Sequence, residues 1–91
     1  MVYLISYRLN RPGQDYKDLY QAIQKISGTY WHHTTSAWLV ESNLPAKQIY
    51  DLINPHVIDV NDELIIFRLQ GEYYGRLAEQ EIWRWLSSLS F

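Results

Sequence analysis

The sequence contains no cysteine, which excludes disulfide bonds and thiolate-bound metal ions. No apolar run approaches the roughly 20 residues of a membrane-spanning helix, and the first residues lack the basic region of a secretion signal. A glycine-rich phosphate loop is also missing, because Gly71 and Gly75 do not lead from a strand into a helix at the required spacing. These absences predict a cytoplasmic protein that has no membrane contact and binds no cofactor.

Positive charge is scarce and unevenly distributed. Eight Lys and Arg residues stand against ten Asp and Glu, and the formal net charge of −2 does not indicate a general nucleic-acid-binding surface. The four cations among residues 1–33, however, outnumber the two acids there. We therefore expect a local basic face in the N-terminal half.

Aromatic residues, in contrast, are abundant, at 15% of a chain of 91 residues. A chain of this length forms one domain, here residues 1–91, and buries only about 60–65% of its unfolded surface. Large aromatic side chains are enriched in the cores of protein interfaces. Length and composition together predict a single domain that associates with itself.

Residues 1–10 are expected to form the strand on which the rest of the fold depends. The segment is apolar on both faces up to the charge at Arg8, and Pro12 and Gly13 then favour a turn. A strand that is apolar on both faces lies in the interior of a sheet.

Two amphipathic helices and three further strands follow. The first helix should begin at the N-cap residue Asp15 and end at Gly28, and the second should run from Asn43 to Asn54-Pro55. The apolar stripe of the second helix comprises Ala46, Ile49, Leu52 and Ile53. Strands are expected at 29–33, 36–42 and 62–69, and a third helix over 77–89.

This order of elements predicts an α+β fold. A β-α-β-β-α-β chain followed by a helix favours a ferredoxin-like fold with a four-stranded antiparallel sheet and an additional C-terminal helix. Both main helices should cover one face of the sheet, and the third helix, a partner or both should cover the other. If the hairpin turn centres on Thr34-Thr35, Trp31 should lie opposite Trp38.

Few residues indicate catalysis. His32 and His33 are adjacent on a strand and point to opposite faces, so they are not expected to bind one metal ion. No strained elbow motif presents a serine nucleophile. Arg8 and Arg11 flank a turn, where they could bind phosphate or pair with acids on the same chain or on a partner.

Three segments of the chain carry a resemblance to known proteins: Val2-Tyr3-Leu4-Ile5-Ser6-Tyr7 with the polar exit Leu9-Asn10, Tyr16-Lys17-Asp18-Leu19-Tyr20, and Ser36-Ala37-Trp38-Leu39-Val40. They resemble the small ferredoxin-fold group around the CRISPR-associated endoribonuclease of spacer adaptation, its VapD-type toxin relatives and short proteins labelled SinR-family. The closing segment Ile82-Trp83-Arg84-Trp85-Leu86 is most similar to the SinR-labelled proteins.

This resemblance implies a homodimer packed through its sheets. In the endoribonucleases of the group, an Asp at the end of the first strand of each subunit surrounds a shared divalent metal ion. Arg8 stands at the matching position here. A cation cannot ligate a metal ion, and two copies near a dimer axis would repel one another unless acids or phosphates lay between them. The substitution argues against an inherited nuclease, so we expect neither a metal site nor a catalytic residue there.

Three hypotheses follow from the sequence. The first is a non-catalytic homodimer that binds the phosphates of RNA or DNA through Arg8, Arg11 and Lys17. The second is a metal-dependent ribonuclease that uses other acids, namely Asp59, Asp62 or Glu63. The third is a protein-interaction module of a toxin–antitoxin or phage-defence system.

Overall fold

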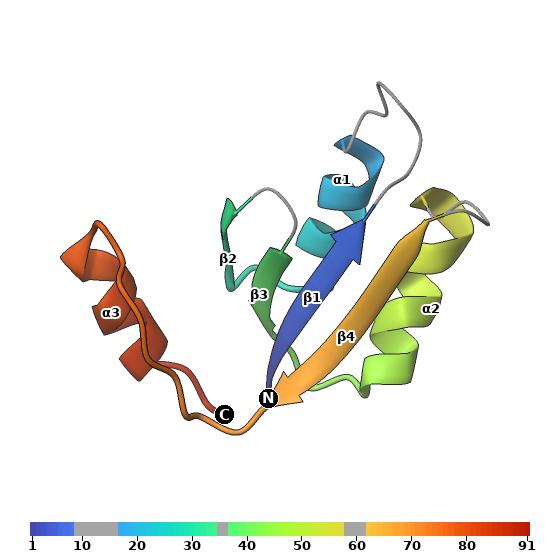
Figure 1. Cartoon of the computed structure of the whole chain (residues 1–91). Helices are drawn as coiled ribbons and strands as arrows, with labels where there is room; N and C mark the ends of the chain where they lie inside the picture. The colour runs from blue at the N-terminus through green and yellow to red at the C-terminus, as the bar shows by residue number, and fades with distance from the viewer. Residues whose placement is uncertain (9–16, 35–36, 58–61) are drawn as a thin grey trace.

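A computed structural model describes residues 1–8, 17–34, 37–57 and 62–91. Within these ranges the chain has an α+β architecture, in which three helices pack on a four-stranded antiparallel open sheet (Figure 1). The strands are β1 (Val2–Arg8), β2 (Tyr30–Thr34), β3 (Ala37–Glu41) and β4 (Glu63–Leu69). The helices are α1 (Lys17–Ile26), α2 (Ala46–Val57) and α3 (Gln80–Ser87).

Strand β1 occupies the interior of the sheet, as its sequence predicts. The strand order is β2-β3-β1-β4, and β1 pairs antiparallel with both β3 and β4. Successive side chains of a strand point to opposite faces, and Val2 and Tyr3 are both buried. Side chains on both faces of β1 are therefore covered at this end of the strand.

Helices α1 and α2 lie on one side of the sheet and cover the main core (Figure 1). Alternate residues of β1 point into this core, together with Trp38 and Val40 of β3. The hydroxyl of Tyr3 donates a hydrogen bond of 2.8 Å to the carbonyl oxygen of Leu44. This bond satisfies the polar tip of a buried ring and ties β1 to the connection that precedes α2.

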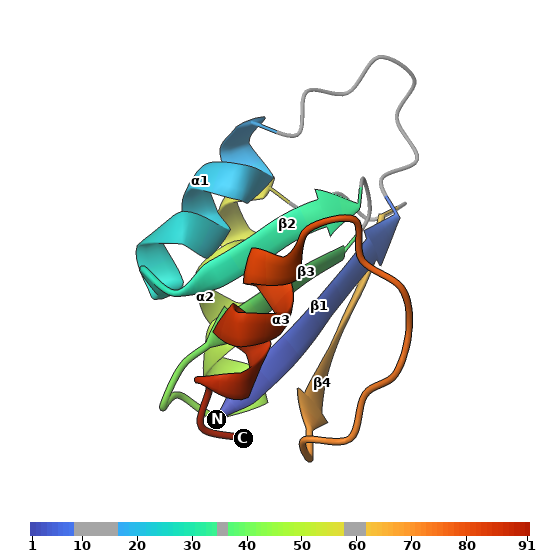
Figure 2. The ribbon, with the colours of Figure 1, turned by 90° about the vertical axis from the view of Figure 1, so that its left-hand side faces the viewer.

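Helix α3 packs on the opposite side, in front of β2, β3 and β1 in Figure 2. Its residues Ile82 and Leu86 are buried, and beyond the helix the backbone N–H of Ser90 donates a 2.7 Å hydrogen bond to the carboxylate of Glu41. The third helix thus contributes to the cover of the second face, as expected, although it is shorter than residues 77–89. No helix in the described ranges has the length and apolarity to cross a membrane.

Helix α2 corrects two predictions. It continues through Pro55 to Val57 instead of ending at Asn54-Pro55. The residue before a proline is only disfavoured in the helical conformation, and near a helix end the proline removes only one hydrogen bond. Leu52 is 53% exposed although it was assigned to the apolar stripe, whereas Ile49 and Ile53 are fully buried.

The β2–β3 hairpin corrects a third prediction. Trp31 pairs with Leu39, not with Trp38. Thr34 itself pairs with Ala37, so the turn does not centre on Thr34-Thr35, and the register then shifts between Trp31 and Thr34. Residues on one strand alternate between faces, so Trp38 lies in the core beneath the helices while Trp31 lies on the α3 side. The predicted turn at Pro12-Gly13, the N-cap residue Asp15 and the acid Asp59 fall outside the described residues.

Candidate functional site

Arg8 ends β1 and is exposed to solvent. Its partner across the β1–β4 ladder is Glu63, also exposed. Directly opposed residues of an antiparallel pair have Cβ atoms about 4.5–5.5 Å apart. Among the described residues, no salt bridge joins the side chains of Arg8 and Glu63. An ion pair of 2.8 Å is present elsewhere, between Lys47 and Asp51 of α2. Arg8 therefore presents its guanidinium to solvent beside a carboxylate.

Lys17 lies at the same end of the molecule as Arg8. It is the first residue of α1, and the start of α1 and the end of β1 both lie toward the upper end of the molecule in Figures 1 and 2, although they are well apart in Figure 2. Lys17 is exposed, whereas Arg11 lies outside the described residues. Asp18 and Glu63 are exposed at this end as well. Among the described residues, the expected basic face thus carries charges of both signs.

The acids of the ribonuclease hypothesis lie only partly within the structure. Asp62 is half-buried and Glu63 exposed at the start of β4. Within the described ranges, no group of three His, Asp or Glu side chains is arranged to hold a metal ion. Because Asp59 lies outside those ranges, the metal-dependent ribonuclease stays a prediction.

His32 belongs to an aromatic cluster of the core. Its ring stacks on Trp38 with 4.1 Å between the centroids and an interplanar angle of 8°. Tyr20 of α1 meets the same imidazole edge-on at 4.6 Å. These contacts give His32 a packing role.

The α3 side of β4 presents two large apolar side chains to solvent. Ile65 is 53% exposed and Phe67 is 50% exposed. Their ladder partners are Ser6 and Leu4, which point away from the core formed with α1 and α2. No helix ribbon lies in front of β4 in Figure 2. We refer to Ile65 and Phe67 as the β4 strip.

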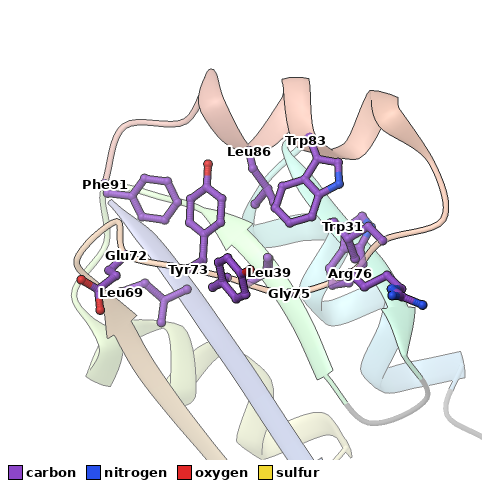
Figure 3. Close-up of a pocket in the computed structure, with 12 residues that line it drawn as sticks. Trp31, Leu39, Leu69, Glu72, Tyr73, Gly75, Arg76, Trp83, Leu86 and Phe91 are labelled. Carbon is purple, nitrogen blue, oxygen red and sulfur yellow. The ribbon is translucent and has the colours of Figure 1, made fainter.

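Beside the β4 strip, a cavity of about 220 Å³ lies between α3 and the sheet (Figure 3). Leu39, Leu69 and Trp31 form its floor, and Trp83 and Leu86 of α3 form its roof. The connection between β4 and α3, residues 70–79, closes one side with Tyr73 and carries Glu72 and Arg76 at the rim. The lining is almost entirely apolar and rich in aromatic rings.

Sequence reasoning identified neither the β4 strip nor the cavity, although the sequence contained a signal for the strip. The run Leu64-Ile65-Ile66-Phe67 is apolar on both faces, which indicated that something must cover each of them. The cavity left no signal, because the rings that line it come from β2, the 70–79 connection, α3 and the C-terminal residue Phe91.

Comparison of the chain with protein-family models, with curated proteins and with solved structures gave no significant match.

Proposed function

We propose that this chain is a small ferredoxin-like protein that forms a non-catalytic homodimer, with the β4 strip in the dimer interface. The observation that carries the proposal is the half-exposure of Ile65 and Phe67, two large apolar side chains side by side on one sheet face. The strand order β2-β3-β1-β4, with α1 and α2 on the same side, supports the ferredoxin-like assignment.

The position of the strip favours association with a second copy. Seven large apolar side chains are exposed in the described residues. Two of them, Ile65 and Phe67, form the β4 strip, and two more, Tyr73 and Tyr74, lie on the connection that follows β4. Clustered exposed apolar groups of this kind mark interaction sites, and aromatic residues are enriched in interface cores. A small domain with limited burial of its own gains stability from such a contact.

The magnitude of this gain predicts a weak dimer. Full burial of a Phe or Ile side chain contributes about 1.5–3 kcal/mol, so covering the exposed half of each contributes about 1 kcal/mol. Two copies bring four such side chains, and association itself costs several kcal/mol. These four side chains supply about 4 kcal/mol together, whereas even a millimolar dimer needs a net of about 4 kcal/mol. The surface around the strip must therefore contribute as well, and a weak, reversible dimer is the expected result.

The charges that flank the strip are compatible with a symmetric contact. Arg8 and Glu63 oppose one another at the end of the ladder that holds Ile65 and Phe67. In a two-fold contact the same patch meets itself, so each arginine can pair with the glutamate of the other copy. This pairing offsets the repulsion that two arginines near a dimer axis would otherwise produce, and the remaining donors among the five of each guanidinium stay available to a phosphate.

Sedimentation velocity over a concentration series tests the dimer. We expect a weak, reversible monomer–dimer equilibrium for the unmodified chain, visible at concentrations up to about 1 mM. Phe67→Glu should weaken it by at least about 100-fold, because each copy would have to bury an unpaired carboxylate. Leu52→Glu is the matched control, since Leu52 is equally exposed but lies on α2. A monomer at every concentration, or equal effects of both variants, would contradict the proposal.

Binding of nucleic-acid phosphates is the second part of the proposed function. This part has narrower support. Arg8 and Lys17 are both exposed at one end of the molecule, and Arg11 lies between them in the sequence. The neighbouring acids reduce the positive potential there, so binding should be weak and strongly dependent on salt.

A further inference from the structure

We propose that the cavity beneath α3 binds a small molecule with a planar aromatic ring and an anionic group. This inference concerns the α3 side of β2 and β3 and does not depend on dimerisation. It rests on the aromatic lining of the cavity, on its volume and on the placement of Arg76.

The lining of the cavity suits a flat ring. Trp83 extends from α3 and Trp31 from β2 toward the same end of the cavity (Figure 3). Tyr73 lies nearly parallel to Trp83, with 6.2 Å between centroids and 25° between planes, and makes a similar contact with Phe91 at 5.9 Å and 28°. A planar ligand can stack on such rings in offset or edge-to-face geometry.

The volume sets the size of the ligand. An apolar cavity of about 150 Å³ accepts a benzene molecule, and drug-sized ligands occupy about 300–1,000 Å³. The cavity beneath α3 has about 220 Å³, so it accommodates one or two fused rings.

Charge at the rim distinguishes the two ends of the cavity. Arg76 lies beside Trp31 at the end toward which both indoles extend, and Glu72 lies near Leu69 at the other end (Figure 3). Both charged side chains are exposed. A guanidinium binds a carboxylate through two parallel hydrogen bonds. A ring held between the indoles would therefore place an attached carboxylate next to Arg76.

Contacts at the C-terminus hold the roof in place. Ser90 is hydrogen-bonded to Glu41, and the Phe91 side chain packs over Gly71, where an added Cβ would lie 3.4 Å from the Cβ of Phe91. Helix α3 lies between these contacts and the 70–79 connection, and its residues Ile82 and Leu86 are buried. The cavity is thus a built feature of the packing of α3.

Titration calorimetry with indole-3-acetate and with indole tests the proposal. We expect saturable binding of indole-3-acetate with Kd on the order of 1 mM or tighter, given the usual binding energy per ligand atom. Arg76→Gln should weaken indole-3-acetate about tenfold, because it removes the charge-assisted hydrogen bonds, and should leave indole unaffected. Arg84→Gln, which removes an exposed arginine that does not line the cavity, is the control.

A cavity-filling variant makes the test independent of charge. Leu39→Trp should abolish binding of both ligands and leave the melting temperature unchanged or higher, because the larger ring occupies the cavity. Leu86→Phe fills the same space from the roof, should the first variant fail to fold. Absence of saturation up to about 5 mM ligand, or unchanged binding in a folded filled variant, would overturn the proposal.

Discussion

Trp38 lies at the centre of the core that α1 and α2 cover. It is 2% exposed and contacts the rings of His32, Tyr20 and Tyr30, the last two at 5.4 and 5.1 Å. Its indole Nε1 is buried and has no hydrogen-bond partner among the described residues. The ring therefore stabilises the fold through packing alone.

The matching prediction concerns two substitutions of this tryptophan. Trp38→Ala should lower the free energy of unfolding by about 3–5 kcal/mol through the cavity it leaves. Trp38→Phe should lower it by only about 1–2 kcal/mol, because it keeps an aromatic contact and removes a donor that lacks an acceptor. Urea unfolding followed by circular dichroism measures the free energy of unfolding of both variants. Tyr74→Ala is the control, because the Tyr74 side chain is fully exposed. Equal losses for the two variants would show that the indole N–H does matter.

Arg8 decides the nucleic-acid part of the proposal. Arg8→Gln should weaken binding of RNA or DNA and reduce the slope of log K against log salt by about 1, if this side chain contacts a phosphate. Fluorescence anisotropy, starting from about 50 mM salt, measures the slope. Arg68→Gln is the control, because Arg68 is also exposed on β4 but pairs with Tyr3 near the other end of the ladder. No binding at low salt, or equal effects of the two variants, would remove this function.

At the scale of elements, the position of β1 could be predicted from its sequence, and the hairpin register could not. An apolar pattern on both faces reports burial directly, because it depends on local side chains. The pairing of Thr34 with Ala37 and the shift between Trp31 and Thr34 depend on how the whole of β2 meets β3, which no short segment encodes. The same limit applies to Leu52, whose spacing fits the stripe of α2 but whose side chain lies beyond the width of the helix contact.

The connection that leads to α3 contains one glycine in a conformation that L side chains rarely adopt. Gly71 has φ of 96°, a left-handed conformation that an L side chain enters at a cost of about 1–2 kcal/mol. Gly71→Ala should therefore loosen α3, raise hydrogen exchange of its amides and leave the exchange of β1 amides unchanged. Gly75→Ala is the matched control, since a Cβ there meets nothing within 4 Å. Equal exchange rates in both variants would contradict this role of Gly71.

At the scale of the whole molecule, self-association stays a prediction. The high aromatic content predicted self-association, and the structure leaves Ile65 and Phe67 half-exposed beside α3. From the sequence one could not decide whether the third helix or a partner covers the second face of the sheet, because either would bury the same apolar residues. The resemblance to the CRISPR-associated group and the candidate site at Arg8, Arg11 and Lys17 stay predictions.

The most direct test of the proposed dimer is an isotope-filtered NOE experiment on a mixture of labelled and unlabelled chains, because it detects only contacts between copies. The β4 strip predicts intermolecular signals between the Ile65 methyl groups and the Phe67 ring. Intermolecular signals confined to Leu52 and Tyr50 of α2, or none at concentrations where the unmodified chain sediments as a dimer, would contradict the proposed interface.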